Sequence, residues 1–461
     1  MGILLLAGCS SSPAARTTSP SSAPSRSSGS AATACIQSWR STAALVPSGD
    51  AAASTDLSGV AAISPADVWA VGSTSPAGKG QQTLAERWNG SSWAIIPAPD
   101  PSSAASLGGD QLTAVAGTSS DDVWAVGYIG ALAPPTPGAT FTAAAQTLTE
   151  HWNGTSWSIV DAPDVAARDG IEPWDVLTSV AAISSDDVWA IGVTEWPLTF
   201  NDEGEVAAQP LVEHWNGKYW AIVNVPDPEP APPDWALATG GVSPTATADV
   251  ASVALLGVTG TSPDDVWLVG GYEPDMGVQN YQPGPWETLT EHWNGTAWSV
   301  VQAPDATLPE PLSDGSKAAD DLLTAAAEAP SGALWAVGGA LPGAALTLRR
   351  GDGAWSLIPS LAVTAQNDGQ VKTAAQWPGY SPEVYVPTFF PGTSPLVSVV
   401  TLGADDAWAV GAVILHWDGT AWQPLYTVND QSFGYLTGVA AAGSGGLWAV
   451  GGMSIVHATC A

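Results

Sequence analysis

The amino-acid sequence predicts an all-β protein, a seven-bladed β-propeller made of four-stranded antiparallel sheets. The first observation behind this prediction is a leucine that stands twelve residues before a tryptophan seven times, at Leu57/Trp69, Leu112/Trp124, Leu177/Trp189, Leu255/Trp267, Leu323/Trp335, Leu396/Trp408 and Leu436/Trp448. The second is a further hairpin pattern that follows each of the first six pairs. Units that repeat along one chain and each supply four short strands are typical of propellers.

The unit at residues 112–163 shows how one blade forms. Short apolar runs at 112–116 and 123–127 are separated by Ser, Thr and Asp, whose side chains bond nearby backbone N–H groups and favour a reversal. Two more runs, at 147–152 and 157–160, are joined by an Asn-Gly turn, which tolerates positive φ angles. The first two runs are apolar at successive positions, so both of their faces should be covered. We therefore expect strands A to D in each blade, with the blades packed face to face.

Six blades follow one another in chain order. They span residues 57–97, 112–163, 177–226, 255–304, 323–359 and 396–428. The seventh blade is predicted from both ends of the chain: residues 436–451 supply strands A and B, residues 454–460 supply strand C, and the segment around Trp39 supplies strand D. This arrangement closes the ring and removes its open edges. Residues 35–461 are therefore expected to form one domain.

Cys35 and Cys460 fall at the two ends of the turn that the seventh blade lacks. A disulfide would replace that turn, and an oxidising compartment outside the cytoplasm permits one. The alternative is a pair of unbonded buried thiols. The agreement in register favours a disulfide between Cys35 and Cys460.

The order of elements resembles a known repeat. An apolar strand ending in Gly127, a variable loop, and a turn followed by Trp157 are similar to the kelch repeats of galactose-oxidase-type propellers. The resemblance covers nearly all of residues 35–461 and implies the propeller fold. It implies no activity, because the copper chemistry of a galactose oxidase needs a Tyr joined to a Cys, and copper-binding His. All three cysteines and all five histidines are assigned other roles here.

The N-terminus has features of a bacterial lipoprotein. Residues 1–9 are apolar and end in Leu-Ala-Gly-Cys, which resembles a lipoprotein cleavage site, so Cys9 is the expected lipidation site. Residues 10–34 are rich in Ser, Ala, Thr and Pro, the composition of a flexible tether. We expect a protein outside the cytoplasm, lipid-anchored to the bacterial cell membrane or surface. The alternative is a chance apolar start with a stray cysteine.

The charge balance limits the partners. The chain has 11 Lys and Arg against 44 Asp and Glu, a formal net charge of −33. Phosphate binding needs clustered basic side chains, so nucleic acids and anionic membrane surfaces are not expected partners. No internal apolar run approaches the ~18 to 20 residues of a membrane-spanning helix. Membrane contact is expected only through the lipid, and the protein is expected to be a monomer.

Two repeated polar patterns are interpreted as structural. All five histidines share one position on strand C, at His151, His214, His292, His416 and His457. Equivalent positions on separate blades cannot converge on one metal ion, whose ligands lie within about 2 to 2.6 Å of it, so we expect no metal and no other cofactor. Four A to B turns carry paired acids, at Asp121-Asp122, Asp186-Asp187, Asp264-Asp265 and Asp405-Asp406. We interpret these pairs as turn caps rather than as calcium ligands or catalytic acids.

The residues that break the repeat are the candidate binding residues. Nineteen of the 24 tryptophans occupy repeat positions and are expected to pack between blades. The other five, in D to A or B to C connections, are Trp174, Trp196, Trp235, Trp286 and Trp377. These connections emerge on one face of an antiparallel blade, and the long insertions share that face, at 128–145, 193–208, 227–254, 271–286, 305–322 and 361–395. Because loops on a rigid scaffold usually carry binding, we expect these tryptophans to anchor a ligand. The alternative is that the loops fold over and bury them.

The sequence favours a non-enzymatic scaffold, which binds a polysaccharide or protein partner through these aromatic loops, over an enzyme. A propeller-type glycosidase or lyase is a second hypothesis, since such enzymes use two carboxylates about 5 to 9.5 Å apart. Its candidate acid and nucleophile are loop carboxylates such as Glu172, Asp175, Glu203, Asp234, Asp275 or Glu383. A purely structural envelope protein is the third hypothesis.

Overall fold

The computed structural model describes residues 39–47, 54–77, 79–102, 109–130, 145–167, 172–197, 206–226, 228, 250–274, 285–306, 320–329, 331–341, 344–359, 396–427, 434–443 and 446–459. The strands in these residues form seven four-stranded antiparallel sheets, as the sequence predicts. In the part of the chain so described, no helix is both long and apolar enough to cross a membrane. The fold is therefore an all-β, seven-bladed propeller.

Each blade takes its strands A to D in chain order, except the last. Blades one to three are β2 (Ser54–Ser64), β3 (Asp67–Ser75), β4 (Gln82–Trp88) and β5 (Trp93–Ile95); β6 (Gly109–Ser119), β7 (Asp122–Gly130), β8 (Gln146–Trp152) and β9 (Trp157–Ile159); and β10 (Trp174–Ser184), β11 (Asp187–Pro197), β12 (Val206–Trp215) and β13 (Trp220–Ile222). Blades four to six are β14 (Val250–Ser262), β15 (Asp265–Pro274), β16 (Glu287–Trp293) and β17 (Trp298–Val300); β18 (Asp320–Glu328), β19 (Leu334–Leu341), β20 (Ala344–Gly351) and β21 (Ala354–Leu357); and β22 (Leu396–Gly403), β23 (Asp406–Gly411), β24 (Val413–Trp417) and β25 (Trp422–Thr427). Blade seven consists of β26 (Gly438–Ala441), β27 (Gly446–Gly451), β28 (Ser454–Thr459) and β1 (Arg40–Ala43).

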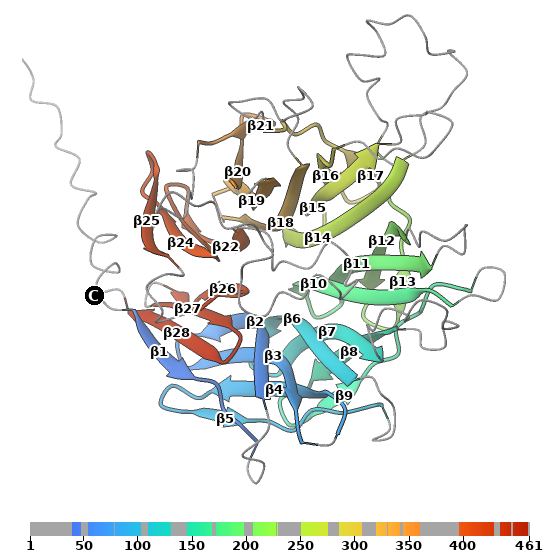
Figure 1. Ribbon diagram of the computed structural model, residues 1–461, viewed down its shortest axis with the longest axis vertical. Helices are drawn as coiled ribbons and strands as arrows, with labels where there is room; N and C mark the ends of the chain where they lie inside the picture. Colours follow the sequence, from blue (N-terminus) through green and yellow to red (C-terminus); the bar gives the residue numbers. More distant parts are fainter. Residues whose placement is uncertain are drawn as a thin grey trace, which may run out of the picture.

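The sheets surround a central axis, with strand A of each blade nearest the axis and strand D outermost (Figure 1). Strands A and B are joined by two-residue turns in most blades, such as Ser120-Asp121 between β6 and β7. The A to B and C to D turns lie at one end of the blades, which we call the turn face. The B to C and D to A connections lie at the other end, which we call the connection face.

Blade seven closes the ring as the sequence predicts. Arg40 of β1 pairs with His457 of β28, so the outermost strand comes from the N-terminal side of the chain. The backbone N–H of Leu57 in blade one donates to the carbonyl of Gly452 at 2.8 Å, and the hydroxyl of Thr437 donates to the carbonyl of Leu57 at 3.1 Å. Blade seven is thus hydrogen-bonded to the inner strand of blade one through Leu57.

A β-bulge in the inner strands links neighbouring blades. The register of strand A shifts just after the repeated leucine, as between Leu112 and Ala114, and leaves Thr113 outside the ladder. The Thr113 hydroxyl donates to the carbonyl of Leu177 in blade three at 2.6 Å. The hydroxyl of Thr324 donates in the same way to Leu396 at 2.9 Å. The bulge therefore places a side-chain donor between two blades.

The bulge also explains the glycine that ends the predicted strand B. A Cβ atom added to Gly127 would lie 1.9 Å from the carbonyl oxygen of Gln111. The two inner strands approach so closely at this point that a side chain cannot fit.

Tryptophans fill the spaces between blades, as their repeat positions predict. Trp69 of blade one lies 5.0 Å from Trp152 and 5.1 Å from Trp157 of blade two, measured between ring centroids. The same grouping recurs around Trp124, Trp189, Trp335 and Trp448. Tilted and edge-on rings at these distances pack favourably and bury large apolar areas. The blades therefore form one continuous ring of aromatic contacts.

Candidate binding face

The connection between blades one and two is held at both ends by carboxylates. Asp100, just after strand D, accepts hydrogen bonds from the backbone N–H of Thr83 at 2.7 Å and from its hydroxyl at 3.0 Å. Asp110, at the start of β6, accepts bonds from the backbone N–H of Ser102, at 2.9 Å, and from its hydroxyl. We call the residues on either side of the connection its stems. Both stems are thereby fixed to the sheets.

The same two carboxylates recur in two further D to A connections. The first of each pair accepts a strand C backbone N–H, with Asp164 bonded to Thr147 at 2.8 Å and Asp305 to Thr288 at 2.7 Å. The second accepts an N–H from the connection itself, with Asp175 bonded to Val165 at 2.6 Å and Asp321 bonded to Ala306. In all three connections the first aspartate directly follows a proline. The fixed φ of proline and the bonding habit of Asp favour such a turn out of strand D.

A network of polar side chains crosses the connection face between blades one and two. Gln81 donates to the hydroxyl of Ser73 at 2.5 Å and to the side-chain oxygen of Gln111 at 3.1 Å. Gln111 in turn donates to Ser58 at 3.1 Å and accepts from the Tyr128 hydroxyl at 3.0 Å. Burial, and to a lesser degree the charge of Asp56, raises the pKa of Tyr128 to about 12. Tyr128 is therefore a neutral hydrogen-bond donor in this network.

Trp174 is not in a D to A connection, and that prediction is wrong. It is the first residue of β10, its side chain is 5% exposed, and it packs with Tyr128, Ala145 and Val176. Inner strands extend beyond the repeated leucine toward the connection face, where they still pair with strand B. The burial of Trp174 agrees with the alternative interpretation, in which a tryptophan is covered by its own surroundings.

Trp286 lies in a B to C connection, as predicted. It directly precedes β16, and its half-buried side chain packs beside Val193, Ala208 and Leu256 of the two adjoining blades. Its carbonyl accepts the backbone N–H of Asp321 at 2.9 Å. Trp286 is thus held rigidly on the connection face with part of its ring exposed.

The other predicted residues are less fully described. Trp196 is part of β11, paired with Ala207, rather than in the loop where the sequence predicts it. Trp235 and Trp377 lie outside the described residues, and so do Cys9, Cys35 and Cys460. The lipidation and the disulfide stay predictions.

Of the loop carboxylates proposed for a glycosidase, some lie within the described residues and others do not. Glu172 is exposed, Asp175 is buried in β10, and Glu203, Asp234, Asp275 and Glu383 lie outside the described residues. Burial raises the pKa of Asp175 to about 6, and the hydrogen bond from the backbone N–H of Val165 opposes only part of that rise.

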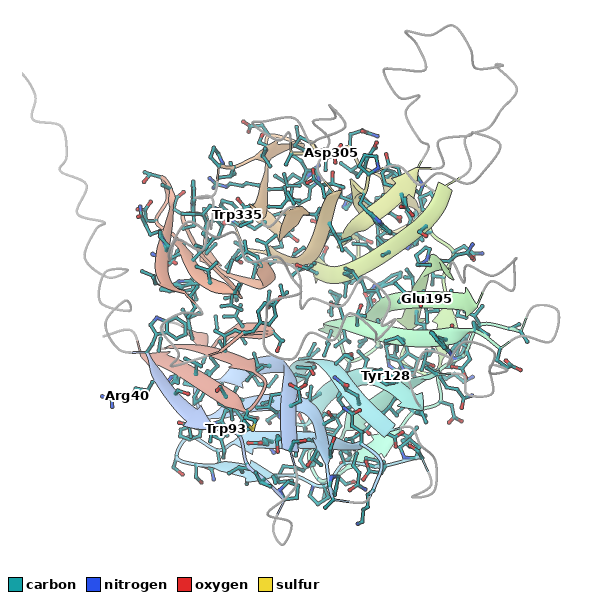
Figure 2. The ribbon with its side chains drawn as sticks, in the orientation of Figure 1. Arg40, Trp93, Tyr128, Glu195, Asp305 and Trp335 are labelled. Carbon is teal, nitrogen blue, oxygen red and sulfur yellow. The ribbon has the colours of Figure 1, made fainter. Side chains whose placement is uncertain are left out.

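A third carboxylate near this end of blade three, Glu195, was not predicted. Burial raises the pKa of Glu195 to about 7, and Glu195 lies on the blade next to Tyr128 (Figure 2). Glu195 pairs with Trp174 across the two strands, whereas Asp175 pairs with Thr194. Because successive residues of a strand project to opposite faces, the carboxylates of Asp175 and Glu195 leave the sheet on opposite sides. They do not form an acid and nucleophile pair.

The sequence interpretation also missed a set of buried glutamates. Strand C carries one in each of the first four blades, each with 0% exposure: Glu86, Glu150, Glu213 and Glu291. The available signal is the repeated order of Glu, then Arg or His, then Trp. An ionisable residue is rarely buried without a partner, so the pattern alone did not indicate burial.

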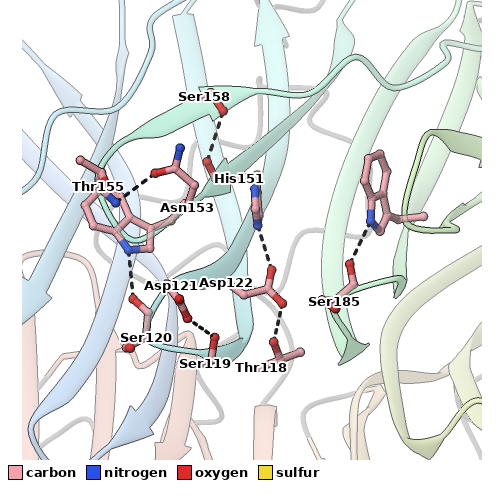
Figure 3. A network of polar contacts seen from close by, with 12 residues as sticks. Thr118, Ser119, Ser120, Asp121, Asp122, His151, Asn153, Thr155, Ser158 and Ser185 are labelled. Carbon is pink, nitrogen blue, oxygen red and sulfur yellow. Dashed lines mark hydrogen bonds and ion pairs between the residues drawn. The ribbon is translucent and has the colours of Figure 1, made fainter.

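The histidines and paired acids lie near the turn face, where they bond each other within one blade. His151 is 2.8 Å from Asp122, which also accepts a bond from Thr118, and Asp121 accepts one from Ser119 at 2.6 Å (Figure 3). His214, His292 and His416 bond Asp187, Asp265 and Asp406 at 2.7 to 3.0 Å. Each histidine also stacks on the strand B tryptophan of its blade, within 4.5 Å. These residues brace the turns, in agreement with their structural interpretation.

Among the described residues, no three His, Cys, Asp or Glu side chains are grouped so that they could hold a metal ion. Near the connection face the described residues include the half-buried Trp286, the amide groups of Gln81 and Gln111, the exposed carboxylates Asp100, Asp164 and Glu172, and the buried carboxylates Asp110 and Asp175. Such a surface suits hydrogen bonding and stacking.

Comparison with known proteins does not assign the chain to a family. No protein-family profile and no curated protein matches the chain. Similar solved structures include YCF48 from Cyanidioschyzon merolae, with 12% identity over 91% of this chain and 98% of that one and a TM-score of 0.42. A streptogramin B lyase has 10% identity over 91% and 97% of the two chains, with a TM-score of 0.44. An aldose sugar dehydrogenase from Streptomyces coelicolor has 11% identity over 92% and 98%, with a TM-score of 0.33.

Proposed function

We propose that this protein is a non-enzymatic propeller scaffold that binds a polysaccharide or protein partner on its connection face. The observation that carries the proposal is the pair of carboxylates that fixes both stems of three connections, as Asp100 and Asp110 do. Stems held in this way present the intervening chain from a rigid ring, which reduces the ordering cost of binding. The turn face, by contrast, is made of short turns that repeat from blade to blade.

Trp286 is the described residue best placed to contact a ligand, because it is rigidly held and partly exposed. The sequence assigns Trp235 and Trp377 to other long connections, and we propose that they complete the binding surface. Trp174, being buried, is assigned to support beneath that surface. The net charge of −33 favours a neutral or cationic partner over a nucleic acid.

We also propose that the repeats are kelch-like and that the protein is located outside the cytoplasm. Lipidation at Cys9 would tether the propeller outside the cytoplasm, on the bacterial cell membrane or surface, with residues 10–34 as the spacer. A disulfide between Cys35 and Cys460 would secure blade seven in that compartment. The connection face would then be free to meet a partner.

A binding screen of residues 35–461 against polysaccharides and envelope proteins tests this function, read out by thermal shift with reducing-sugar release measured in the same wells. We expect a shift without sugar release. The shift should disappear in the triple variant Trp235→Ala, Trp286→Ala, Trp377→Ala, provided that this variant stays folded.

The matched control is Tyr219→Ala, since Tyr219 is 55% exposed in the C to D turn of blade three, on the turn face. Binding that survives in the triple variant would contradict the proposed surface. Release of sugar would instead assign a glycosidase or lyase.

A further inference from the structure

The buried glutamates of strand C occupy one equivalent position in successive blades. Glu86 pairs with Ala70 and Ile95 in its sheet, and Glu150 pairs with Ala125 and Ile159 in the next. The flanking residues of the sheet are therefore apolar. Leu148 and Trp152, two residues either side of Glu150, pack with Trp69 of blade one, so Glu150 also points toward blade one. Each glutamate thus lies between its own blade and the preceding one.

The first glutamate has a hydrogen-bond donor. Oε1 of Glu86 accepts the backbone N–H of Leu45 at 2.8 Å. Leu45 lies in the connection from blade seven to blade one, six residues after Trp39. A donor from the preceding connection therefore meets this carboxylate.

In the next two connections a proline occupies the position equivalent to Leu45. The residue six positions after the strand D tryptophan is Pro99 in blade one and Pro163 in blade two. Proline has no backbone N–H to donate. Accordingly, no protein group in the described residues donates to either carboxyl oxygen of Glu150 or Glu213, although both side chains are fully buried.

The charged groups around Glu150 are also unfavourable to a carboxylate. Asp100 and Asp110 act on it from the stems of the preceding connection, and both raise its pKa. Arg87, on β4, is a cation at that interface, but it forms an ion pair with Asp67 at 2.7 Å and stacks on Trp69. The exposed side chain of Lys79 acts on Asp100 instead.

Glu213 has the equivalent surroundings one blade further on. Asp164 and Asp175 act on it from the stems of the connection between blades two and three. His151, at the position of Arg87, is bonded to Asp122. Glu172 is a further negative charge near Asp175.

We propose that Glu150 and Glu213 are proton-binding sites between blades, and that loss of their protons loosens the connections whose stems they adjoin. A buried carboxyl without a donor is far more stable as the neutral acid than as the anion. The neutral acid carries no charge, and the charged groups that act on it are the carboxylates of the stems. The anion would instead add a further negative charge beside two aspartates that hold the connection in place.

The ionisation properties agree with this placement. Burial, reinforced by the two stem aspartates, raises the pKa of Glu150 to about 8 and that of Glu213 to about 9, from an ordinary value of 4.5. Below pH 4.5 both carboxyls are protonated in the folded and the unfolded chain. Between pH 4.5 and about 8 to 9 the folded protein keeps protons that the unfolded chain has lost, so stability falls as pH rises through this window. Above this window both carboxyls are ionised in the folded chain as well, and the stability that came from their bound protons is lost.

The test is thermal unfolding of the full chain at pH 5, 7 and 9, with the double variant Glu150→Gln, Glu213→Gln beside the wild type. The melting temperature of the wild type should fall by roughly 5 °C or more between pH 5 and pH 9. The double variant should lose most of that fall, because its amides do not ionise. Hydrogen exchange at pH 9 should also be faster in the stems at residues 97–102 and 161–167 of the wild type than in the double variant.

Two single variants serve as controls. Glu86→Gln alters the equivalent carboxyl that has a donor, and Glu172→Gln removes an exposed charge near the same connection. Both should keep most of the wild-type pH dependence. An equal fall in melting temperature in the double variant and the wild type would overturn the proposal. The proposal would also be overturned if calcium chloride at pH 9 raised the melting temperature of the wild type but not that of the double variant, since that result assigns a cation site.

A second substitution decides the matter if the double variant does not fold. Pro99→Ala with Pro163→Ala restores a backbone N–H at the position of Leu45. A donor for each carboxylate should lower both pKa values and reduce the fall in melting temperature between pH 5 and pH 9. An unchanged fall would count against the proposal.

Discussion

The indole ring of Trp39 lies 5.7 Å from that of Trp408, although the two residues stand near opposite ends of the chain. Trp39 directly precedes the outermost strand of blade seven, and Trp408 is in strand B of blade six. The apolar cluster they share includes Leu436, Val439 and Val456. One residue from the N-terminal side therefore completes the packing between the last two blades.

Replacing Trp39 should weaken the ring at this interface. Trp39→Ala removes a 9% exposed indole and is expected to lower the free energy of unfolding by about 3 to 5 kcal/mol. Denaturant unfolding measures the change. Tyr219→Ala, on an exposed side chain, should stay within about 0.5 kcal/mol of the wild type. Equal effects of the two substitutions would mean that blade seven does not depend on Trp39.

Gly127 should tolerate no side chain. The 1.9 Å approach of its would-be Cβ to the Gln111 carbonyl forces the inner strands apart, so Gly127→Ala should cost about 3 kcal/mol or more. Gly351 also ends a strand but has no atom within 4 Å of the same position, and Gly351→Ala should change stability by less than about 1 kcal/mol. Urea titration of both variants checks this contrast, and a stable Gly127→Ala would show that the bulge can relax.

Arg87 should not be replaceable by lysine. It occupies the position that His151 holds in the next blade, and its Nε and Nη2 atoms each donate to a different oxygen of Asp67 at 2.7 Å. Arg87→Lys loses the second bond and the stacking on Trp69, so we expect a loss of about 1 to 2 kcal/mol in urea unfolding. Arg40→Lys, at an exposed position, is the matched control. Indistinguishable midpoints for the two variants would contradict a role for the paired bond.

Asp418 should make its turn sensitive to acid. The hydroxyl of Thr420 and the backbone N–H groups of Ala421 and Thr420 hydrogen-bond to this carboxylate and hold its pKa well below the ordinary 3.8. Its contribution to stability is therefore present above pH 3.8 and is lost as pH falls below that value. Asp418→Asn keeps an acceptor that does not titrate, so unfolding of this variant between pH 2 and pH 5 should depend less on pH.

The reverse exchange tests the same reasoning in another blade. Asn153 accepts the backbone N–H groups of Thr155 and Ser156 in the equivalent turn. Asn153→Asp should add a dependence on acid that the wild-type turn lacks. Identical acid unfolding of Asn153→Asp and the wild type would show that these turn bonds do not affect global stability.

The sequence predicts the blades well because their signal is repeated. The Leu112 to Trp124 spacing locates the hairpin of strands A and B, and both predicted strands lie within β6 and β7. Strand β7 nevertheless continues to Gly130, and its pairing with β8 extends to Ile129 and Gln146. The blades extend toward the connection face with residues that differ from one blade to the next, so repetition gives no signal there.

The candidate site is predicted less well for the same reason. Trp174 resembles an exposed loop residue in the sequence, yet it begins a strand and packs against Tyr128 of the preceding blade. Glu150 is missed because its burial depends on the preceding blade, far away in sequence, and on a proline in that blade's connection. Neither environment can be read from the residues next to it along the chain.

The construction of blade seven determines when the molecule can be completed during synthesis. Of the described strands, β1 is translated first, but its partner β28 is translated last. Six blades can pair their own strands as they emerge from the ribosome, while Trp39 has neither a sheet to extend nor a neighbouring blade to cover. Ring closure is therefore a late step that waits until β28 has been synthesised, and until then the growing propeller keeps open strand edges.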